Sequence, residues 1–253
     1  MRYIIQAACG CNMGKVRKTN EDNFFFDGKC LEENNTGLRN CTYFEGRATR
    51  GLSFGVFDGM GGENFGELAS YRAARQMQTA DRKPSDFFIP ERLFLEELSR
   101  QMNEAVVAAQ KEMCTEHMGS TMVALYVCGA DVNLCNVGDS RAYRLRDGEF
   151  LQISTDHVEK RPGKEDKKAP LSQYLGIDPE EMEIEPYIAK GKLKIGDRYL
   201  FCSDGLTDML TNFEISDIML QNEDVEDCVQ KLIQAALEHG GRDNITVILC
   251  EIV

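Results

Sequence analysis

Five short acidic motifs are spread along the chain, and most of them stand at the edge of an apolar run. They are Thr19-Asn20-Glu21-Asp22, Phe57-Asp58-Gly59, Gly138-Asp139-Ser140, Ser203-Asp204-Gly205 and Arg242-Asp243-Asn244. Carboxylates so far apart in sequence form one site only if strand ends at one rim of a sheet bring them together. Gathered carboxylates repel one another unless a cation lies among them. Because oxygen ligands favour hard cations such as Mg²⁺ or Mn²⁺, the motifs indicate a metal-dependent enzyme.

The four Asp-Gly pairs of the chain do not all have the same context. Such pairs usually mark turns, and Asp27-Gly28 and Asp147-Gly148 lie between strand-like runs, as hairpin turns do. Asp58 and Asp204 instead follow hydrophobic runs and are not followed by another strand. A carboxylate at a buried strand end, with a glycine behind it, leaves room for a metal ion and its waters. We therefore interpret Asp58 and Asp204 as metal ligands.

Arg17 precedes the carboxylate pair Glu21-Asp22 by four residues. A guanidinium group is suited to a bidentate grip on phosphate. The simpler interpretation is a surface ion pair in a turn before the strand that begins at Asn23.

The elements that must position these residues are mostly strands. Enrichment in β-branched and aromatic residues predicts strands over Tyr3–Ala8, Asn23–Phe26, Leu52–Phe57, Ser120–Val127, Val132–Val137, Ala142–Leu145, Phe150–Ile153, Tyr199–Cys202 and Thr246–Ile252. Apolar residues at helical spacing predict helices over Phe65–Ala80, Glu91–Met113 and Val225–His239. The helices do not alternate regularly with the strands. An α+β fold, with antiparallel sheets and helices on their outer faces, is therefore favoured over a doubly wound parallel sheet.

Length and composition narrow the class of protein. The chain has 253 residues, of which 42% are hydrophobic, which is enough for one large domain or for two small ones. The net charge of −13 argues against a general nucleic-acid binder. The apolar stretch at the amino terminus is too short for a signal peptide, and no run approaches the ~18 apolar residues of a membrane span. We expect a cytoplasmic protein without nucleic-acid or membrane partners and, because nothing signals oligomerisation, a monomer.

Six motifs follow one another in a defined order. They are Arg-x-x-Asn-Glu-Asp from Arg17, Val-Phe-Asp-Gly-Met-Gly-Gly from Val56, Gly-Ser-Thr from Gly119, Asn-Val-Gly-Asp-Ser-Arg from Asn136, Ser-Asp-Gly-Leu-Thr-Asp from Ser203 and Arg-Asp-Asn-Ile-Thr-Val from Arg242. Each alone is weak, but the ordered set, which runs from about Gly14 to the carboxyl terminus, resembles the PP2C-type (PPM) metal-dependent protein phosphatases in their compact bacterial form. The resemblance implies a single domain over residues 1–253, built of two packed antiparallel sheets flanked by helix pairs. It also implies hydrolysis of phosphoserine and phosphothreonine in phosphorylated proteins.

The resemblance also assigns roles by matching position. Asp22, Asp58, Asp204 and Asp243 match ligands of a metal pair, with Asp58 bridging, Gly59 adding its backbone carbonyl and Glu21 binding through water. Asp139 and Asp208 match positions that, with Asp204, hold a third and weaker metal. Arg17 matches the phosphate-binding arginine. The expected cofactors are two or three Mn²⁺ or Mg²⁺ ions.

The implied chemistry agrees with the residues present. Two cations a few ångströms apart lower the pKa of a bridging water, and the resulting hydroxide attacks phosphorus in line. The metals and Arg17 neutralise charge on the phosphoryl oxygens. We expect Arg17, Asp22 and Asp58 to be the catalytic residues.

Two features depart from the family pattern. Relatives from animals and plants often carry His after the Asp-Gly pair, where this chain has Met60, so the general acid is either a metal-bound water or His157. His157 has a simpler interpretation as a loop histidine, which we prefer. The mobile flap of the family is expected within about Asp156–Pro186 and begins with basic residues: Lys160, Arg161, Lys164, Lys167 and Lys168. This segment is either a solvated loop or a surface for acidic or multiply phosphorylated substrates.

Two alternative functions are weighed against this one. Residues 11–17 fit the Cys-x5-Arg phosphate loop of cysteine-dependent phosphatases, but the residues after Arg17 do not predict the helix that such a loop needs. A catalytically silent family member would usually lack metal ligands, whereas all the matching acidic positions are filled here. The resemblance alone makes a Ser/Thr kinase and its substrates plausible partners.

Overall fold

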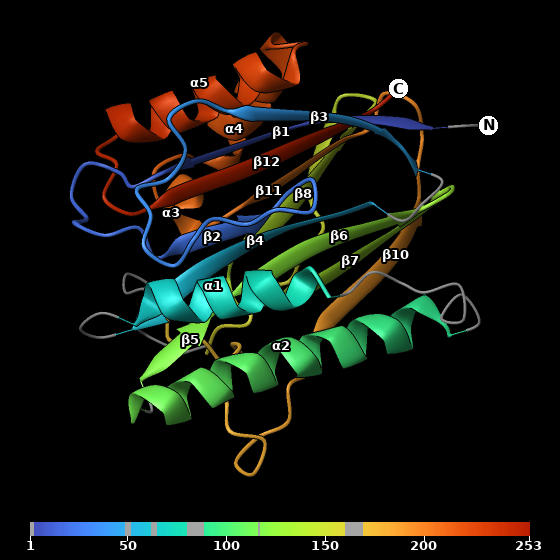
Figure 1. Ribbon diagram of the computed structural model, residues 1–253. Coiled ribbons are helices and arrows are strands. Elements are labelled where there is room, and N and C mark those ends of the chain that lie inside the picture. Colours follow the sequence, from blue (N-terminus) through green and yellow to red (C-terminus); the bar gives the residue numbers. More distant parts are fainter. Residues whose placement is uncertain (1–2, 49–51, 62–64, 80–88, 116, 160–168) are drawn as a thin grey trace.

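The structure is a computed structural model that describes residues 3–48, 52–61, 65–79, 89–115, 117–159 and 169–253. Within these residues, two antiparallel sheets of six strands each pack face to face, and helices cover the outer face of each sheet (Figure 1). This arrangement confirms the predicted α+β class with two antiparallel sheets.

The two sheets divide the chain unevenly. The first sheet has the order β3-β1-β12-β11-β8-β9, and the second has the order β10-β7-β6-β4-β2 with β5 paired to β4. The strands of the first sheet are β1 (Ile4–Asn12), β3 (Thr42–Arg47), β8 (Arg141–Arg146), β9 (Glu149–Gln152), β11 (Arg198–Cys202) and β12 (Ile245–Ile252). Those of the second sheet are β2 (Asp22–Phe25), β4 (Leu52–Gly61), β5 (Met118–Ser120), β6 (Met122–Cys128), β7 (Asp131–Val137) and β10 (Tyr187–Lys192).

The central strands are largely apolar because both of their faces are buried. In β12, Ile248 and Cys250 belong to the core between the two sheets, whereas Val247 and Leu249 pack on the helical side. This alternation follows the period of two along a strand. Each fully buried side chain of this size contributes about 1.5–3 kcal/mol through the hydrophobic effect. The packed sheets therefore form a stiff frame for the polar residues at the strand ends.

The helices lie in two layers outside the sheets (Figure 1). The second sheet is covered by α1 (Gly66–Met77) and α2 (Glu91–Met113), and the first by α4 (Asn212–Gln221) and α5 (Val225–Glu238). The single turn α3 (Asp204–Thr207) follows β11 directly. None of the described helices is long and apolar enough to cross a membrane.

Most of the predicted elements are present, and the differences have physical reasons. All nine predicted strands occur, and both hairpin turns have positive φ at Asp27 and Asp147, as their Asp-Gly sequences predict. Prediction missed the strands β3, β5 and β10 and the helices α3 and α4. Of these, β3 and β10 lie at sheet edges, where each contains a glycine and carries charged residues on exposed positions, so neither has a long apolar run. The predicted helix end at Ala80 lies outside the described residues.

A buried ion pair fastens the turn before β11. Arg146 donates from Nε to Oδ1 and from Nη2 to Oδ2 of Asp197, both at 2.6 Å, and Asp197 is only 1% exposed. Burial alone would raise the pKa of Asp197, but the bonds from Arg146, the Lys194 amide and Tyr199 hold it below its ordinary value. The folded state therefore favours the ionised carboxylate.

We predict that Asp197→Asn lowers the free energy of unfolding by about 2–3 kcal/mol at pH 7, because charge-assisted bonds are lost. A carboxylate whose pKa is depressed by folding contributes its full stabilisation of the folded state when the pH is above its pKa in the unfolded chain. This stabilisation is lost as the pH falls through its pKa in the folded protein. The difference from wild type should therefore shrink in acid, as urea unfolding at several pH values would measure. Asp147→Asn is the control, because Asp147 and its partner Lys194 are both exposed. An equal loss of unfolding free energy in the two variants would contradict the prediction.

Candidate functional site

The acidic motifs meet at one rim of the sandwich. The strands β4, β7 and β11 end at this rim, and β2, β8 and β12 begin there, because neighbouring strands run antiparallel. Asp22 is paired directly with Asp58 in the register of β2 and β4. A cavity of about 380 Å³ opens at the rim. Seven of the predicted residues line it: Arg17, Glu21, Asp58, Gly59, Asp139, Asp204 and Asp243.

Asp22 lies beneath this cavity rather than on its wall. Its side chain is 1% exposed, and its Oδ2 accepts hydrogen bonds of 2.7 Å from the hydroxyls of Ser203 and Thr246. Burial raises the pKa of Asp22 to about 7; the carboxylates of Asp243 and Glu21 add to the rise, and the two hydroxyl bonds oppose it. A nearby cation would favour the ionised form of such a group.

Asp58 is fixed through its backbone. Its amide donates to Thr121 Oγ1 at 3.1 Å, and its carbonyl accepts from the Thr121 amide at 2.8 Å. The next residue must be glycine, since a Cβ on Gly59 would lie 2.1 Å from the carbonyl oxygen of Gly66 and 2.4 Å from that of Glu21. The first residue of α1 thus presses the Asp58-Gly59 corner against Glu21.

A second close approach brings Asp204 beside Asp243. Gly205, in α3, abuts the start of β12 so tightly that a Cβ would lie 1.9 Å from the carbonyl oxygen of Asn244. The strand β11 and the turn α3 therefore deliver Asp204 to the side of the cavity that carries Asp243.

Arg17 is the one cationic side chain among the described residues that line the cavity. Its Nη2 lies 2.7 Å from Asp243 Oδ2, and its Nη1 lies 3.9 Å from Glu21 Oε2. Burial raises the pKa of Glu21, and Arg17 partly offsets that rise. The ion pair suggested by the simpler interpretation exists, but its closer partner is Asp243, which is remote in sequence. The Arg17 side chain is 47% exposed, so it can also reach a bound anion.

The three residues predicted to hold a third metal are only partly brought together. Asp139 and Asp204 line the cavity, whereas Asp208 does not. Asp208 is exposed, and its amide donates to the Asp204 carbonyl at 2.7 Å, one turn along α3. Its assignment as a ligand remains a prediction.

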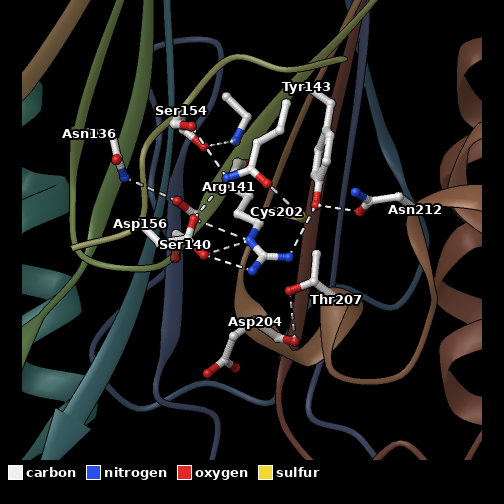
Figure 2. Close-up of polar contacts among 12 residues, drawn as sticks. Asn136, Ser140, Arg141, Tyr143, Ser154, Asp156, Cys202, Asp204, Thr207 and Asn212 are labelled. Carbon is white, nitrogen blue, oxygen red and sulfur yellow. Dashed lines mark hydrogen bonds and ion pairs between the residues drawn. The ribbon is translucent and has the colours of Figure 1, made fainter. Parts of the chain in front are cut away.

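Arg141, close to Asp139 in sequence, is engaged elsewhere. Figure 2 shows its guanidinium bonded to Asp156, with Asp204 extending away from it; Nη2 and Nε donate to Asp156 Oδ2 at 2.7 and 2.9 Å. This ion pair fastens the start of the predicted flap to β8. The basic residues of that flap, Lys160 to Lys168, lie outside the described residues.

The donor set at the cavity suits hard cations. Among the described residues of its wall, five carboxylates accompany one guanidinium, and carboxylates gathered in this way favour divalent metal ions. Among the described residues, however, no three carboxylate, imidazole or thiol groups form a ready-made ligand set for one ion. Waters and the Gly59 carbonyl would have to complete the coordination, as Mg²⁺ commonly requires. The individual ligand assignments therefore stay predictions.

The thiol of Cys11 does not suit the alternative cysteine mechanism. It is 2% exposed, and burial, with the nearby charge of Asp22, raises its pKa to about 12. No helix follows Arg17 in the described residues 17–21. A protonated, buried thiol is a poor nucleophile, so the Cys-x5-Arg interpretation is not supported.

His157 is held away from the cavity wall. Its Nδ1 accepts a hydrogen bond of 3.1 Å from the Gly138 amide, and burial lowers its pKa. The imidazole is therefore neutral at neutral pH and serves to fasten the loop that carries Asp139. Met60, by contrast, does line the cavity.

Several residues of the six motifs position the carboxylates, a role that the sequence analysis did not assign to them. Ser203 and Thr246 bond Asp22, Thr121 holds Asp58, and Asn244 ties the loop before β2 to β12. Asn244 Nδ2 donates to the carbonyls of Met13 and Thr19 at 2.9 and 3.0 Å, and its Oδ1 accepts from the Glu21 amide at 2.8 Å. Polar residues at the edges of apolar runs were the available signal.

We predict that Asn244→Ala frees the loop over residues 13–21 without unfolding the sheets. Losing the bond to the Glu21 amide costs about 1–3 kcal/mol, which corresponds to exchange of that amide at least about fivefold faster. Hydrogen–deuterium exchange read by mass spectrometry would measure this. Gln234→Ala is the control, because Gln234 is exposed on α5 and bonds to Glu238. Unchanged exchange over 13–21 in Asn244→Ala would contradict the role assigned to Asn244.

Comparison with known proteins gives a consistent result. The family model described as "Protein phosphatase 2C" matches residues 41–249. The serine/threonine protein phosphatase PstP of Mycobacterium tuberculosis is 31% identical over 261 residues, covering 99% of this chain but only 45% of its own length. The serine/threonine phosphatase stp of Listeria innocua is 33% identical over 211 residues, covering 78% of this chain and 82% of the relative. The chain thus spans less than half of the mycobacterial relative.

Solved structures agree with the sequence comparisons. The catalytic domain of PstP in complex with two manganese ions superposes with a TM-score of 0.80 at 30% identity, covering 99% of both chains. PppA, described as a key regulatory component of T6SS in Pseudomonas aeruginosa, gives a TM-score of 0.77 at 27% identity and covers 99% of this chain and all of its own.

Proposed function

Because the chain belongs to the protein phosphatase 2C family, we propose that it hydrolyses phosphoserine and phosphothreonine in phosphorylated proteins with the help of divalent metal ions. The observation that carries this proposal is the meeting of Glu21, Asp58, Asp139, Asp204 and Asp243 around one cavity beside Arg17. Ser/Thr kinases and their substrates are the partners we propose. We further propose that residues 1–253 form one domain that acts as a monomer in the cytoplasm.

The proposed metal ligands are Asp22, Asp58, Asp204 and Asp243, with the Gly59 carbonyl and, through water, Glu21. Two Mn²⁺ or Mg²⁺ ions would be held there, and a third by Asp139, Asp204 and Asp208. When bound, such ions supply Lewis acidity to a water nucleophile and to the phosphoryl oxygens. The manganese-bound PstP structure supports this for a relative.

The chain's own residues orient the substrate. Arg17 is half exposed at the cavity mouth, so its guanidinium can leave Asp243 and bind the phosphoryl oxygens of a substrate. The N–H donors of a guanidinium match the geometry of these oxygens. The bonds to Thr121 fix the backbone of Asp58 at the cavity. Met60 cannot transfer a proton, and the buried, neutral His157 is bonded to Gly138. We therefore propose that solvent at the cavity protonates the leaving alcohol.

The first test is hydrolysis of a phosphothreonine peptide with Mn²⁺, with excess EDTA, and after thiol alkylation. We expect activity that needs the metal and survives alkylation, because the buried Cys11 has no role in the reaction. Activity that persists in EDTA but disappears on alkylation would contradict the metal-dependent mechanism.

A second test removes a proposed bridging ligand. Asp58→Asn should lower kcat/KM by at least about 1000-fold, which is about 4 kcal/mol of transition-state stabilisation. Asp27→Asn is the matched control, since Asp27 lies in a hairpin turn whose positive φ asparagine tolerates. Wild-type activity in Asp58→Asn would rule out the proposed role of this carboxylate.

A further inference from the structure

The carboxylate of Asp22 is fixed by two hydroxyl groups from the opposite sheet. Asp22 begins β2 in the second sheet, whereas Ser203 follows β11 and Thr246 lies in β12 of the first. Side chains alternate along a strand, and Phe24 in β2 and Ile248 in β12 both belong to the core between the sheets. Asp22 and Thr246 therefore face each other across the rim of this core.

Both hydroxyls meet the same carboxylate oxygen. Ser203 Oγ and Thr246 Oγ1 each lie 2.7 Å from Asp22 Oδ2. The three side chains are buried, with exposures of 1% for Asp22 and 0% for the other two. A free carboxylate has two equivalent oxygens. Two donors on Oδ2 remove that equivalence and fix the rotation of the group.

The backbone sets the direction of the serine bond. The Thr246 amide donates to Ser203 Oγ at 3.0 Å, and the Ser203 amide donates to the Thr246 carbonyl at 3.1 Å. Ser203 Oγ is thus already an acceptor, and its proton is available for Asp22. Its hydroxyl therefore donates to the carboxylate.

Thr246 has a single hydroxyl proton and two neighbours. Its Oγ1 lies 3.2 Å from Cys11 Sγ but only 2.7 Å from Asp22 Oδ2. A carboxyl oxygen is a stronger hydrogen-bond acceptor than a thiol sulfur, so the proton is directed to Asp22. Neither hydroxyl carries charge, so the pair orients Asp22 and leaves its negative charge for a cation.

We propose that Ser203 and Thr246 are positioning residues: they hold Oδ2 of Asp22 and so present Oδ1 to a divalent cation. The inference rests on the proposed function, because it takes Asp22 as a ligand of the metal pair. Hydrogen-bond partners of metal-binding side chains commonly change metal affinity by 10–100-fold when they are removed. The two hydroxyls should therefore set the affinity of the site for Mn²⁺.

The test measures Mn²⁺ binding by calorimetry on the whole chain without substrate. Thr246→Val removes the hydroxyl with little change in volume, and Thr246→Ser keeps it. We expect the Kd for Mn²⁺ to rise about 10–100-fold in Thr246→Val and in Ser203→Ala, and to stay within about threefold of wild type in Thr246→Ser. Wild-type Kd values in both Thr246→Val and Ser203→Ala would overturn the proposal. Equal weakening in Thr246→Val and Thr246→Ser would also overturn it.

A control separates positioning from loss of stability. Ser99 is also fully buried and donates to the Leu95 carbonyl at 2.8 Å, but it lies in α2, outside the second sheet. Thermal unfolding in EDTA would be measured for every variant. We expect Ser99→Ala to unfold at a lower temperature yet bind Mn²⁺ with the wild-type Kd. A Kd raised as much in Ser99→Ala as in Thr246→Val would overturn the specific role of the hydroxyl pair.

Hydrolysis of the phosphothreonine peptide in the same samples separates this inference from the proposed function. If the wild-type protein binds Mn²⁺ and the variants weaken this binding as expected, but the wild type does not hydrolyse the peptide, the positioning role is supported and the proposed function is contradicted. A wild-type protein that binds no Mn²⁺ contradicts both. Activity of Thr246→Val that recovers at saturating Mn²⁺ supports both.

Discussion

Mutual repulsion among carboxylates is the constraint on which the structure of the rim depends. Two unit charges 4 Å apart interact with about 4 kcal/mol at the effective dielectric constant of a protein surface. The fold nevertheless places five acidic side chains around one cavity and buries Asp22 beneath them. Such an arrangement persists only if the backbone that carries it cannot relax. The two sheets, each apolar on both faces at its central strands, provide that rigidity.

Several of the contacts that orient the carboxylates come from uncharged groups. Thr121 bonds the backbone of Asp58, two hydroxyls bond Asp22, and the Asn244 amide group holds the loop before Glu21. Arg141 and Arg146 are engaged with Asp156 and Asp197, and the only cationic side chain on the described cavity wall is Arg17. Divalent cations, and then a phosphate bound to them, are the ligands that such a site suits best.

Much of this could be predicted from the sequence because strand ends were visible. Apolar runs before Asp58 and Asp204 predicted both strands and placed the two carboxylates beside them. The predicted strand end at Phe57 was wrong, because β4 continues through Asp58 to Gly61, where it pairs with the short strand β5. Edge strands such as β3 were missed because only one side of them is paired, so charged residues and glycine are tolerated there. Asp208 does not line the cavity. Its position depends on the geometry of the single helical turn α3 that precedes it, which residue types do not specify.

The positioning residues were harder to foresee than the charged ones. Thr246 belongs to the last of the six motifs, but its contact with Asp22 depends on how the two sheets pack, which the motif does not specify. For Cys11 the sequence suggested too much. Its spacing to Arg17 fits a cysteine-dependent phosphatase, but the thiol is buried and burial raises its pKa. Packing between distant segments, rather than local pattern, decided both.

The central claim is that the gathered carboxylates bind divalent metal ions. Anomalous diffraction from crystals grown with Mn²⁺ tests it most directly, because the signal locates the ions without reference to activity. The account predicts at least two strong peaks in the rim cavity, within coordination distance of Asp22, Asp58, Asp204 and Asp243. Peaks only at other places on the surface, or none in this cavity at saturating Mn²⁺, would contradict it.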